Sequence, residues 1–201
     1  MDRLKMEEEV KTRLTEMRYE HTLGVQATCF SLALTYGADY NDATCAGLLH
    51  DVAKCLTDDE FLNECIKYDI PITKVEKENP HLLHGKLGAY YAKTQFNISN
   101  RNILNAIINH TTGRPNMSLL EKIVFVGDYI EPGRRESRNP SLKQVREIAF
   151  KDLDLSVVTI LKSNIDYLSD DKSKIDSKTI DTYNYYMNKI WKDWKVINDR
   201  I

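Results

Sequence analysis

Long stretches without helix-breaking residues constrain this chain more than any other feature of its sequence. Only 8 glycines and 5 prolines occur among 201 residues, and strand-like alternation of apolar and polar residues is scarce. Glycine and proline are the residues that most often interrupt a helix, so their scarcity leaves long segments free to be helical. The sequence therefore predicts an all-α protein.

Local signals place the ends of several helices. Gly37 ends an apolar-periodic segment, Asn41 or Asp42 is suited to cap the next helix, and Thr57 with Glu60 has the pattern of a capping box. A loop is expected between prolines 71 and 80, a turn at 131–135 and a polar connection at 169–177. The expected helices cover about residues 3–17, 19–36, 42–51, a short segment after 57, 82–95, 100–110, 118–130, 141–150, 153–169 and a final helix after 177.

The final helix has apolar residues at intervals of three or four, which predicts a packing surface whose first turn could instead contact a ligand. These residues are Ile180, Tyr183, Tyr186, Ile190, Trp194 and Ile197. No internal repeat or composition shift divides the chain, and its length suits one domain, residues 1–201.

Composition limits the classes of function. The net charge is −2, so no bulk electrostatic attraction to nucleic acid or anionic lipid is expected. No segment approaches the length of a membrane span, and residues 1–10 lack the apolar run of a signal peptide. The cysteines form no C-x-x-C pair, and we expect small buried thiols within helices at Cys29, Cys45, Cys55 and Cys65. A cytoplasmic protein is predicted.

His50 and Asp51 are adjacent and offer a neutral nitrogen and an anionic oxygen to the same ion. Such a mixed ligand set suits iron, manganese or zinc. A bound ion of this kind can activate water near neutral pH, which favours hydrolysis. Four further residues that could bind metal lie at intervals that match the spacing of successive helices along the chain: His21, His84, His110 and Asp128.

Helix lengths allow these residues to converge. About 22 Å of helix separates His21 from its helix end, and about 14 Å separates Asn41 from His50, so an antiparallel return with some tilt can bring both histidines to one level. Asp128 ends an apolar helix, where a carboxylate is costly unless it is paired or bound to metal. A single His or Asp in a helix is usually not a ligand, but this ordered set predicts one metal site: His21, His50, Asp51 and Asp128. Glycines at 47, 85 and 127 flank these positions and permit close backbone approach.

Several segments around these residues resemble those of the HD-domain phosphohydrolase superfamily, and more narrowly the YqeK family of bacterial symmetrical diadenosine-tetraphosphate hydrolases. The resemblance covers about residues 10–190 and is most specific where Thr-Gly-Arg-Pro and Asp-Tyr-Ile-Glu-Pro occur together. The matching segments are 18–22, 49–54, 79–85, 110–115, 119–134 and 182–184.

The resemblance implies a single HD-domain helical bundle, with an HD core at about 17–131 and C-terminal helices at about 141–199 completing a nucleotide pocket. It implies iron at the predicted metal site, with manganese or zinc as alternatives, and a second ion if His84 and His110 act as ligands. His81 shares a helix face with His84, which we favour for the site because Gly85 follows it. The residues expected to contact substrate are Arg18, Asp51, Lys54, His84, His110, Asp128, Arg134, Tyr183 and Asn184.

The expected reaction is symmetrical cleavage of diadenosine tetraphosphate into two ADP by metal-activated water, with Asp51, His84 and His110 as catalytic residues. Arg18, Lys54, Arg114 and Arg134 could bind the phosphates. Two alternatives remain open: another HD nucleotide phosphohydrolase acting on a deoxynucleotide or an alarmone, and a metal-binding nucleotide sensor without turnover. The expected partner is a dinucleoside polyphosphate or a nucleoside diphosphate, with neither nucleic acid nor membrane, and apolar helix faces would allow a homodimer.

Overall fold

The structure is a computed structural model that describes residues 3–168 and 175–198, and every regular element within these ranges is a helix. The predicted all-α class is confirmed. The helices, with η marking 3₁₀ helices, are α1 Arg3–Arg13, α2 Glu16–Tyr36, α3 Tyr40–Leu49, α4 Asp58–Lys67, α5 Lys74–Glu78, η1 Pro80–Leu83, α6 His84–Thr94, α7 Arg101–Asn109, α8 Leu119–Ile130, η2 Glu136–Arg138, α9 Leu142–Ile148, α10 Leu153–Tyr167 and α11 Ser177–Asn198.

Helix ends that depend on strong local chemistry agree with the sequence-based expectation. Gly37 ends α2 in the left-handed conformation, with φ 68°, where a residue without Cβ is favoured. Thr57 and Glu60 form the expected capping box of α4. These local signals therefore locate the end of α2 and the start of α4 correctly.

Three boundaries differ from the expectation because other caps compete. α1 ends at Arg13 rather than near 17, since Thr15 caps α2 by accepting a hydrogen bond from the Arg18 amide. α3 is capped by Asp39, whose carboxylate accepts bonds from the next turn, rather than by Asn41 or Asp42. The predicted loop between the two prolines contains α5, which a Thr73–Glu76 capping box starts.

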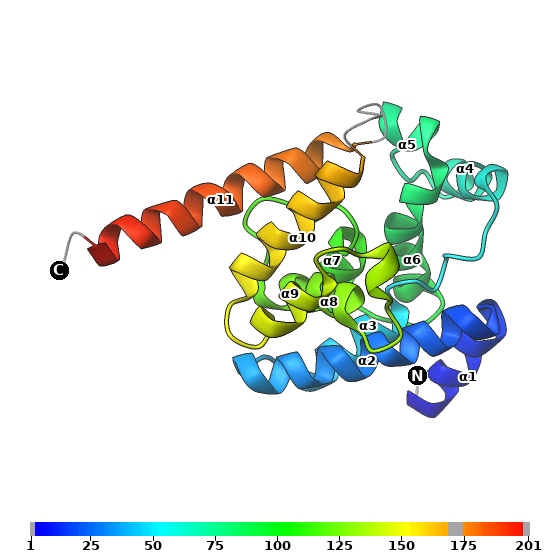
Figure 1. Cartoon of the computed structure of the whole chain (residues 1–201). Helices are drawn as coiled ribbons and strands as arrows, with labels where there is room; N and C mark the ends of the chain where they lie inside the picture. Colours follow the sequence, from blue (N-terminus) through cyan, green and yellow to red (C-terminus); the bar gives the residue numbers. More distant parts are fainter. Residues whose placement is uncertain (1–2, 169–174, 199–201) are drawn as a thin grey trace.

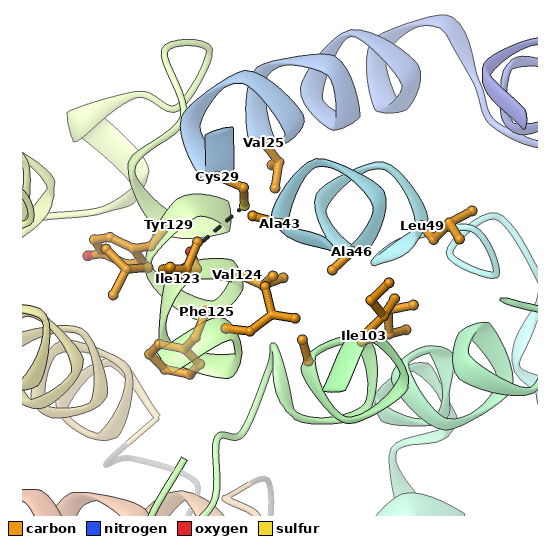
Figure 2. Packing of buried hydrophobic residues seen from close by; sticks show 14 of the residues in the cluster. Val25, Cys29, Ala43, Ala46, Leu49, Ile103, Ile123, Val124, Phe125 and Tyr129 are labelled. Carbon is orange, nitrogen blue, oxygen red and sulfur yellow. Dashed lines mark hydrogen bonds between the residues drawn. The ribbon is translucent and has the colours of Figure 1, made fainter. Parts of the chain in front are cut away.

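α2, α3 and α8 meet around Cys29 in the core (Figure 2). A Cβ on Gly47 would lie 3.1 Å from Gln26 Cα, and one on Gly127 would lie 2.8 Å from Cys29 Sγ. Cys29 is fully buried, and burial raises the pKa of its thiol. Small residues thus let three backbones approach closely, as the sequence indicated. The expectation of buried helical thiols is confirmed for Cys29 and Cys65, while Cys45 in α3 is only half-buried. It is wrong for Cys55, which is exposed in the turn after α3.

The C-terminal helices lie against the body through α10, while the second half of α11 extends away from it (Figure 1). Tyr186 is fully buried, and Tyr183 and Ile190 pack against the core, which agrees with the predicted stripe. The Trp194 and Ile197 side chains, and residues 169–174 of the predicted connection, lie outside the described residues. In the part of the chain that is described, no helix is long and apolar enough to traverse a membrane.

Candidate metal centre

Three helices bring the first group of candidate ligands together. His21 lies in α2, His50 and Asp51 follow the last turn of α3, and Asp128 lies in the last turn of α8. His21 Nε2 is 3.0 Å from Asp128 Oδ1 and 3.9 Å from Asp51 Oδ2. His50 Nε2 is 3.4 Å from Asp51 Oδ2 and 3.9 Å from Asp128 Oδ1. The antiparallel packing of α2 and α3 thus produces the convergence that helix lengths predicted.

A second group shares Asp51 with the first. His84 begins α6 and His110 follows α7, and their Nε2 atoms are 3.4 and 3.5 Å from Asp51 Oδ1. The two Nε2 atoms are 2.9 Å apart. One oxygen of Asp51 therefore faces His21 and His50, and the other faces His84 and His110.

All four imidazoles are held in one orientation by acceptors at Nδ1. Three of them follow a helix or a 3₁₀ turn, where carbonyls lack a partner in the helix. His50 Nδ1 lies 2.7 Å from the Gly47 carbonyl, His84 Nδ1 2.5 Å from that of His81, and His110 Nδ1 2.7 Å from that of Ile107. A protonated Nδ1 donates to each carbonyl, so each Nε2 presents a lone pair to the carboxylates.

His21 obtains the same orientation from Glu131. Its Nδ1 lies 3.1 Å from Glu131 Oε1, and the Gly133 amide donates to Glu131 Oε2 at 2.6 Å. A Cβ on Gly24 would lie only 2.5 Å from Glu131 Oε2, so this glycine makes room for the carboxylate. The sequence pattern indicates only a turn at Glu131 and misses this role. The glycines at 24 and 133 are the available signal that a buried group fits between them.

The residues present fit a metal ion. The Nε2 atoms of His21 and His50 are buried and make no hydrogen bond within the described structure. Buried polar atoms without partners are rare, because leaving one unsatisfied costs about 1–3 kcal/mol. Two ligands each about 2.1 Å from one ion lie roughly 3–3.5 Å apart, close to the separations observed here. Two imidazole nitrogens and two carboxylates are a suitable donor set for iron, manganese or zinc.

Both carboxylates stay ionised. Burial raises the pKa of Asp51, but His50, His110 and His84 outweigh burial and hold this pKa well below its usual value. Burial likewise opposes ionisation of Asp128, and Arg134 together with the histidines outweighs it, so that its pKa is also well below the usual value. Two anionic oxygens are therefore available to a cation near neutral pH.

Three cationic side chains surround the centre, as expected for a phosphate site. Arg18 Nη1 donates to Asp51 Oδ2 at 2.9 Å, and Arg134 donates to both the carboxylate and the backbone carbonyl of Asp128. Lys54 Nζ lies 3.2 Å from His84 Nδ1. Burial, then Lys54 and His110, hold the pKa of His84 well below 6.5, so His84 is neutral at pH 7.

Other predicted residues lie elsewhere. Tyr183 is half-buried on α11 and lines a smaller cavity of about 510 Å³, while Asn184 is exposed. His81 is exposed, and His84 is the one that faces the centre. The Arg114 guanidinium donates to both oxygens of Glu121 at 2.6 Å, so it stabilises the start of α8 instead of standing free for phosphate.

A large cavity opens beside the first group of ligands. Its volume is about 1030 Å³, and it is bordered by the first half of α2, the turn after α8 and the end of α10. Arg18, His21 and Arg134 line it, so a ligand in this cavity can reach the metal centre.

Comparison with known proteins identifies the class. The model of the HD domain matches residues 18–133, which contain all six clustered His and Asp residues. The chain therefore belongs to the HD-domain family, as its sequence indicated. More particularly, it is 41% identical over 184 residues to the symmetrical bis(5'-nucleosyl)-tetraphosphatase of Halalkalibacterium halodurans, covering 92% of this chain and 96% of that protein.

Two further relatives match this chain over a similar share of its length. The protein of the same name from Bacillus subtilis is 36% identical over 179 residues, covering 89% of this chain and 94% of the relative. A crystal structure from Clostridium acetobutylicum, described as a predicted HD superfamily hydrolase involved in NAD metabolism, superposes with a TM-score of 0.89. It is 36% identical, and the match covers 94% of this chain and 98% of the other. The likeness thus includes the C-terminal helices as well as the HD core.

Proposed function

We propose that this protein is a symmetrical dinucleoside-tetraphosphate hydrolase, which cleaves diadenosine tetraphosphate between its two inner phosphorus atoms and releases two ADP. The observation that carries the proposal is the group of His21, His50, Asp51 and Asp128, in which the buried Nε2 atoms of both histidines lack a hydrogen-bond partner and face two ionised carboxylates. The relatives named for this activity, which match over about nine tenths of both chains, support the choice of substrate.

The charge of the centre suits a polyphosphate. Three carboxylates, those of Asp51, Asp128 and Glu131, are balanced by three basic side chains, Arg18, Lys54 and Arg134. A divalent cation would leave an excess of positive charge, and it would supply Lewis-acid polarisation of a phosphoryl oxygen and a more acidic water. We propose iron, with manganese and zinc as the alternatives that the same ligands accept.

The protein's own residues then hold the substrate and move protons. Arg18 and Arg134 present planar forks to phosphate oxygens, and Lys54 supplies a point charge on the His84 side. Asp51 orients the attacking water, which adds to one inner phosphorus while the bond to the bridging oxygen breaks. One proton held between the Nε2 atoms of His84 and His110, which lie 2.9 Å apart, would pass to the departing ADP oxygen.

The group of Asp51, His84 and His110 also has the composition of a second metal site. The two Nε2 lone pairs face each other at 2.9 Å, an arrangement that either a proton or a cation would stabilise. We favour one ion per chain, with His84 and His110 acting on the substrate. Counting metal ions per chain distinguishes this from a two-ion centre.

We further propose that the whole chain is one domain, in which α9 to α11 complete the nucleotide pocket with Tyr183 and Asn184 on its border. The C-terminal boundary of the large cavity, at the end of α10, supports this role. Four free thiols suit the reducing cytoplasm as the location. A homodimer through exposed apolar helix faces stays a prediction.

One experiment tests the activity and the metal together. Purified protein is analysed for bound metal and incubated with diadenosine tetraphosphate, and the products are separated by chromatography. We expect ADP as the sole nucleotide product, at two per substrate. His50→Ala should lose bound metal and at least about a hundredfold in kcat/KM, since it removes a ligand. His81→Ala, the matched histidine outside the centre, should keep both.

Products of other composition would contradict the proposal. ATP and AMP would indicate cleavage at an outer phosphate, and turnover of deoxynucleotides or alarmones in preference to diadenosine tetraphosphate would favour the other HD phosphohydrolases. Tight nucleotide binding without any product from metal-loaded protein would favour a sensor. Full activity and metal content in His50→Ala would contradict the ligand assignment.

A further inference from the structure

The two groups of the centre differ in what the Nε2 atoms of their histidines contact. In the first group, the buried Nε2 atoms of His21 and His50 make no hydrogen bond within the described structure. In the second group, Thr111 Oγ1 lies 3.1 Å from His84 Nε2 and 3.2 Å from His110 Nε2. One hydroxyl therefore reaches both rings of the second group.

Thr111 supplies a donor that these two rings need. Their Nδ1 atoms lie against backbone carbonyls, so in the neutral rings of His84 and His110 the proton is on Nδ1 and Nε2 can only accept. Two acceptors 2.9 Å apart repel each other unless a donor reaches them. A threonine hydroxyl has one proton to donate and two lone pairs that can accept. It therefore fits the pair both when the pair is neutral and when it carries an added proton.

The turn after α7 fixes the position of Thr111. The Gly113 amide donates to the Asn109 carbonyl at 2.9 Å, and Gly113 has φ 65°, where a residue without Cβ is favoured. A Cβ on Gly113 would also lie 2.8 Å from the side chain of Thr182 in α11. The hydroxyl of Thr112, the next residue in the turn, donates to the Gly113 carbonyl at 3.2 Å. The hydroxyls of two adjacent threonines thus have different partners.

We propose that Thr111 is a positioning residue for the reaction: its hydroxyl, in contact with the Nε2 atoms of His84 and His110, keeps both rings aimed at one point beside Asp51. The inference rests on the proposed function, which assigns proton transfer to this pair. It also concerns the number of metal ions, because a hydroxyl that donates to an Nε2 lone pair competes with a cation for that lone pair. One ion per chain, held by the first group, is therefore the expected content.

Paired substitutions separate the hydroxyl from the rest of the side chain. Thr111→Val keeps the branched shape and removes the hydroxyl, so kcat for diadenosine tetraphosphate should fall about tenfold, the size of one ordinary hydrogen bond, with KM changed less than about twofold. Thr111→Ser keeps the hydroxyl and should stay within about threefold of the wild type, since the hydrogen bond is retained. Thr112→Val is the matched control on the next residue and should leave kcat unchanged. All four proteins should hold the same single ion per chain and give the same circular dichroism spectrum.

A spectroscopic measurement reports the contact without any turnover. Protein labelled with nitrogen-15 in its histidines and loaded with zinc is studied by NMR, since the resonance of an acceptor nitrogen moves when its donor is lost. Thr111→Val should move the Nε2 resonance of His84 or His110 toward that of an acceptor without a donor. The resonances of the exposed His81 should stay in place.

The outcomes distinguish this inference from the proposed function. Wild-type kcat and unmoved Nε2 resonances in Thr111→Val would overturn the role of Thr111 alone, as would an equal loss of kcat in Thr111→Val and Thr111→Ser. Two ions per chain in the wild type would also overturn it, because the Nε2 lone pairs of the second group would then bind the second ion. If the wild type cleaved no diadenosine tetraphosphate while the Nε2 resonances still moved in Thr111→Val, the proposed reaction would fall and the contact would stand.

Discussion

Asp51 is the residue on which both halves of the candidate centre depend. Its Oδ2 accepts from Arg18 and faces His21 and His50, and its Oδ1 faces His84 and His110. Any substitution at this position is therefore expected to disturb metal binding, phosphate binding and proton transfer together. These roles are better tested separately, at residues that contact only one of the metal ligands.

Glu131 is such a residue, because its side chain reaches the centre only through His21. Glu131→Ala removes the acceptor at His21 Nδ1, so we expect metal affinity to fall about 10- to 100-fold, as for other groups that orient a ligand. Glu131→Gln keeps one acceptor but sets an amide against the Gly133 amide, so an intermediate loss is expected. Competition with a chelator of known affinity measures both variants.

Measuring metal affinity distinguishes the orientation of His21 by Glu131 from a general effect of the substitution on folding. Circular dichroism and melting of the metal-free variants report any general loss of structure. If Glu131→Ala held metal as tightly as the wild type, the orienting role would be wrong, whatever the effect on stability.

At the level of elements, α6 and α7 are in contact where the two histidines of the second group meet. A Cβ on Gly85 would lie 2.9 Å from the Ile108 carbonyl oxygen and 3.1 Å from that of Ile107. Both are backbone atoms and cannot turn aside. Gly85→Ala should therefore push the helices apart and disturb the His84–His110 pair.

We expect Gly85→Ala to lower stability by about 1–3 kcal/mol, as overpacking does, and to reduce kcat. Gly88→Ala is the matched control on the next turn, since its Cβ would meet nothing closer than 3.5 Å. That variant should be neutral or stabilised by up to about 1 kcal/mol, because alanine is the better helix former. Urea unfolding and hydrolysis assays compare the two. Equal behaviour of both variants would contradict the close approach.

For the molecule as a whole, buried acids set the response to pH. Burial raises the pKa of Glu121, but hydrogen bonds from Arg114 and Ser118 outweigh burial and hold this pKa below 4.5. Burial also raises the pKa of Glu76, and Lys86 and Thr73 outweigh burial there, so that its pKa is below 4.5 as well. Both groups bind protons less readily folded than unfolded. Their contribution is complete above about pH 4.5 and is lost as the pH falls further.

Glu121→Gln tests this dependence. At pH 7 the variant should be less stable by about 1–3 kcal/mol, since its charge-assisted bonds to Arg114 are lost. As the pH falls below 4.5 the difference from the wild type should shrink, because the unfolded wild-type chain binds a proton at Glu121 more readily than the folded protein does. Urea unfolding at pH 7, 5 and 3.5 measures both trends. A difference that widened in acid would mean that the folded protein does not lower the pKa of Glu121.

Much of the fold could be predicted from the sequence because helix ends carry local signals. Gly37 and the Thr57–Glu60 box act within one turn, and the expectation is correct there. The two prolines predict a loop, but the Thr73–Glu76 box between them starts α5. The predicted first helix is too long because Thr15 caps α2 and ends the helical run before it.

The candidate site also contains some residues that could be predicted from the sequence and others that could not. The clustered ligands could be anticipated because each lies at or near a helix end or beside a small residue. Glu131 could not, because its role depends on a contact with His21 across 110 positions of sequence. Arg114 is a candidate for phosphate in the sequence, but its forked bond to Glu121 forms only once the turn before α8 is folded.

The uniform anchoring of all four imidazoles at Nδ1 has a consequence for how the protein is loaded. A template fixed before any ion arrives discriminates weakly between ions of similar size, so the supply of each metal decides which ion occupies it. The element recovered after purification should accordingly record what the growth medium supplied. Cultures supplemented with iron, manganese or zinc in turn should yield the same polypeptide with different occupants.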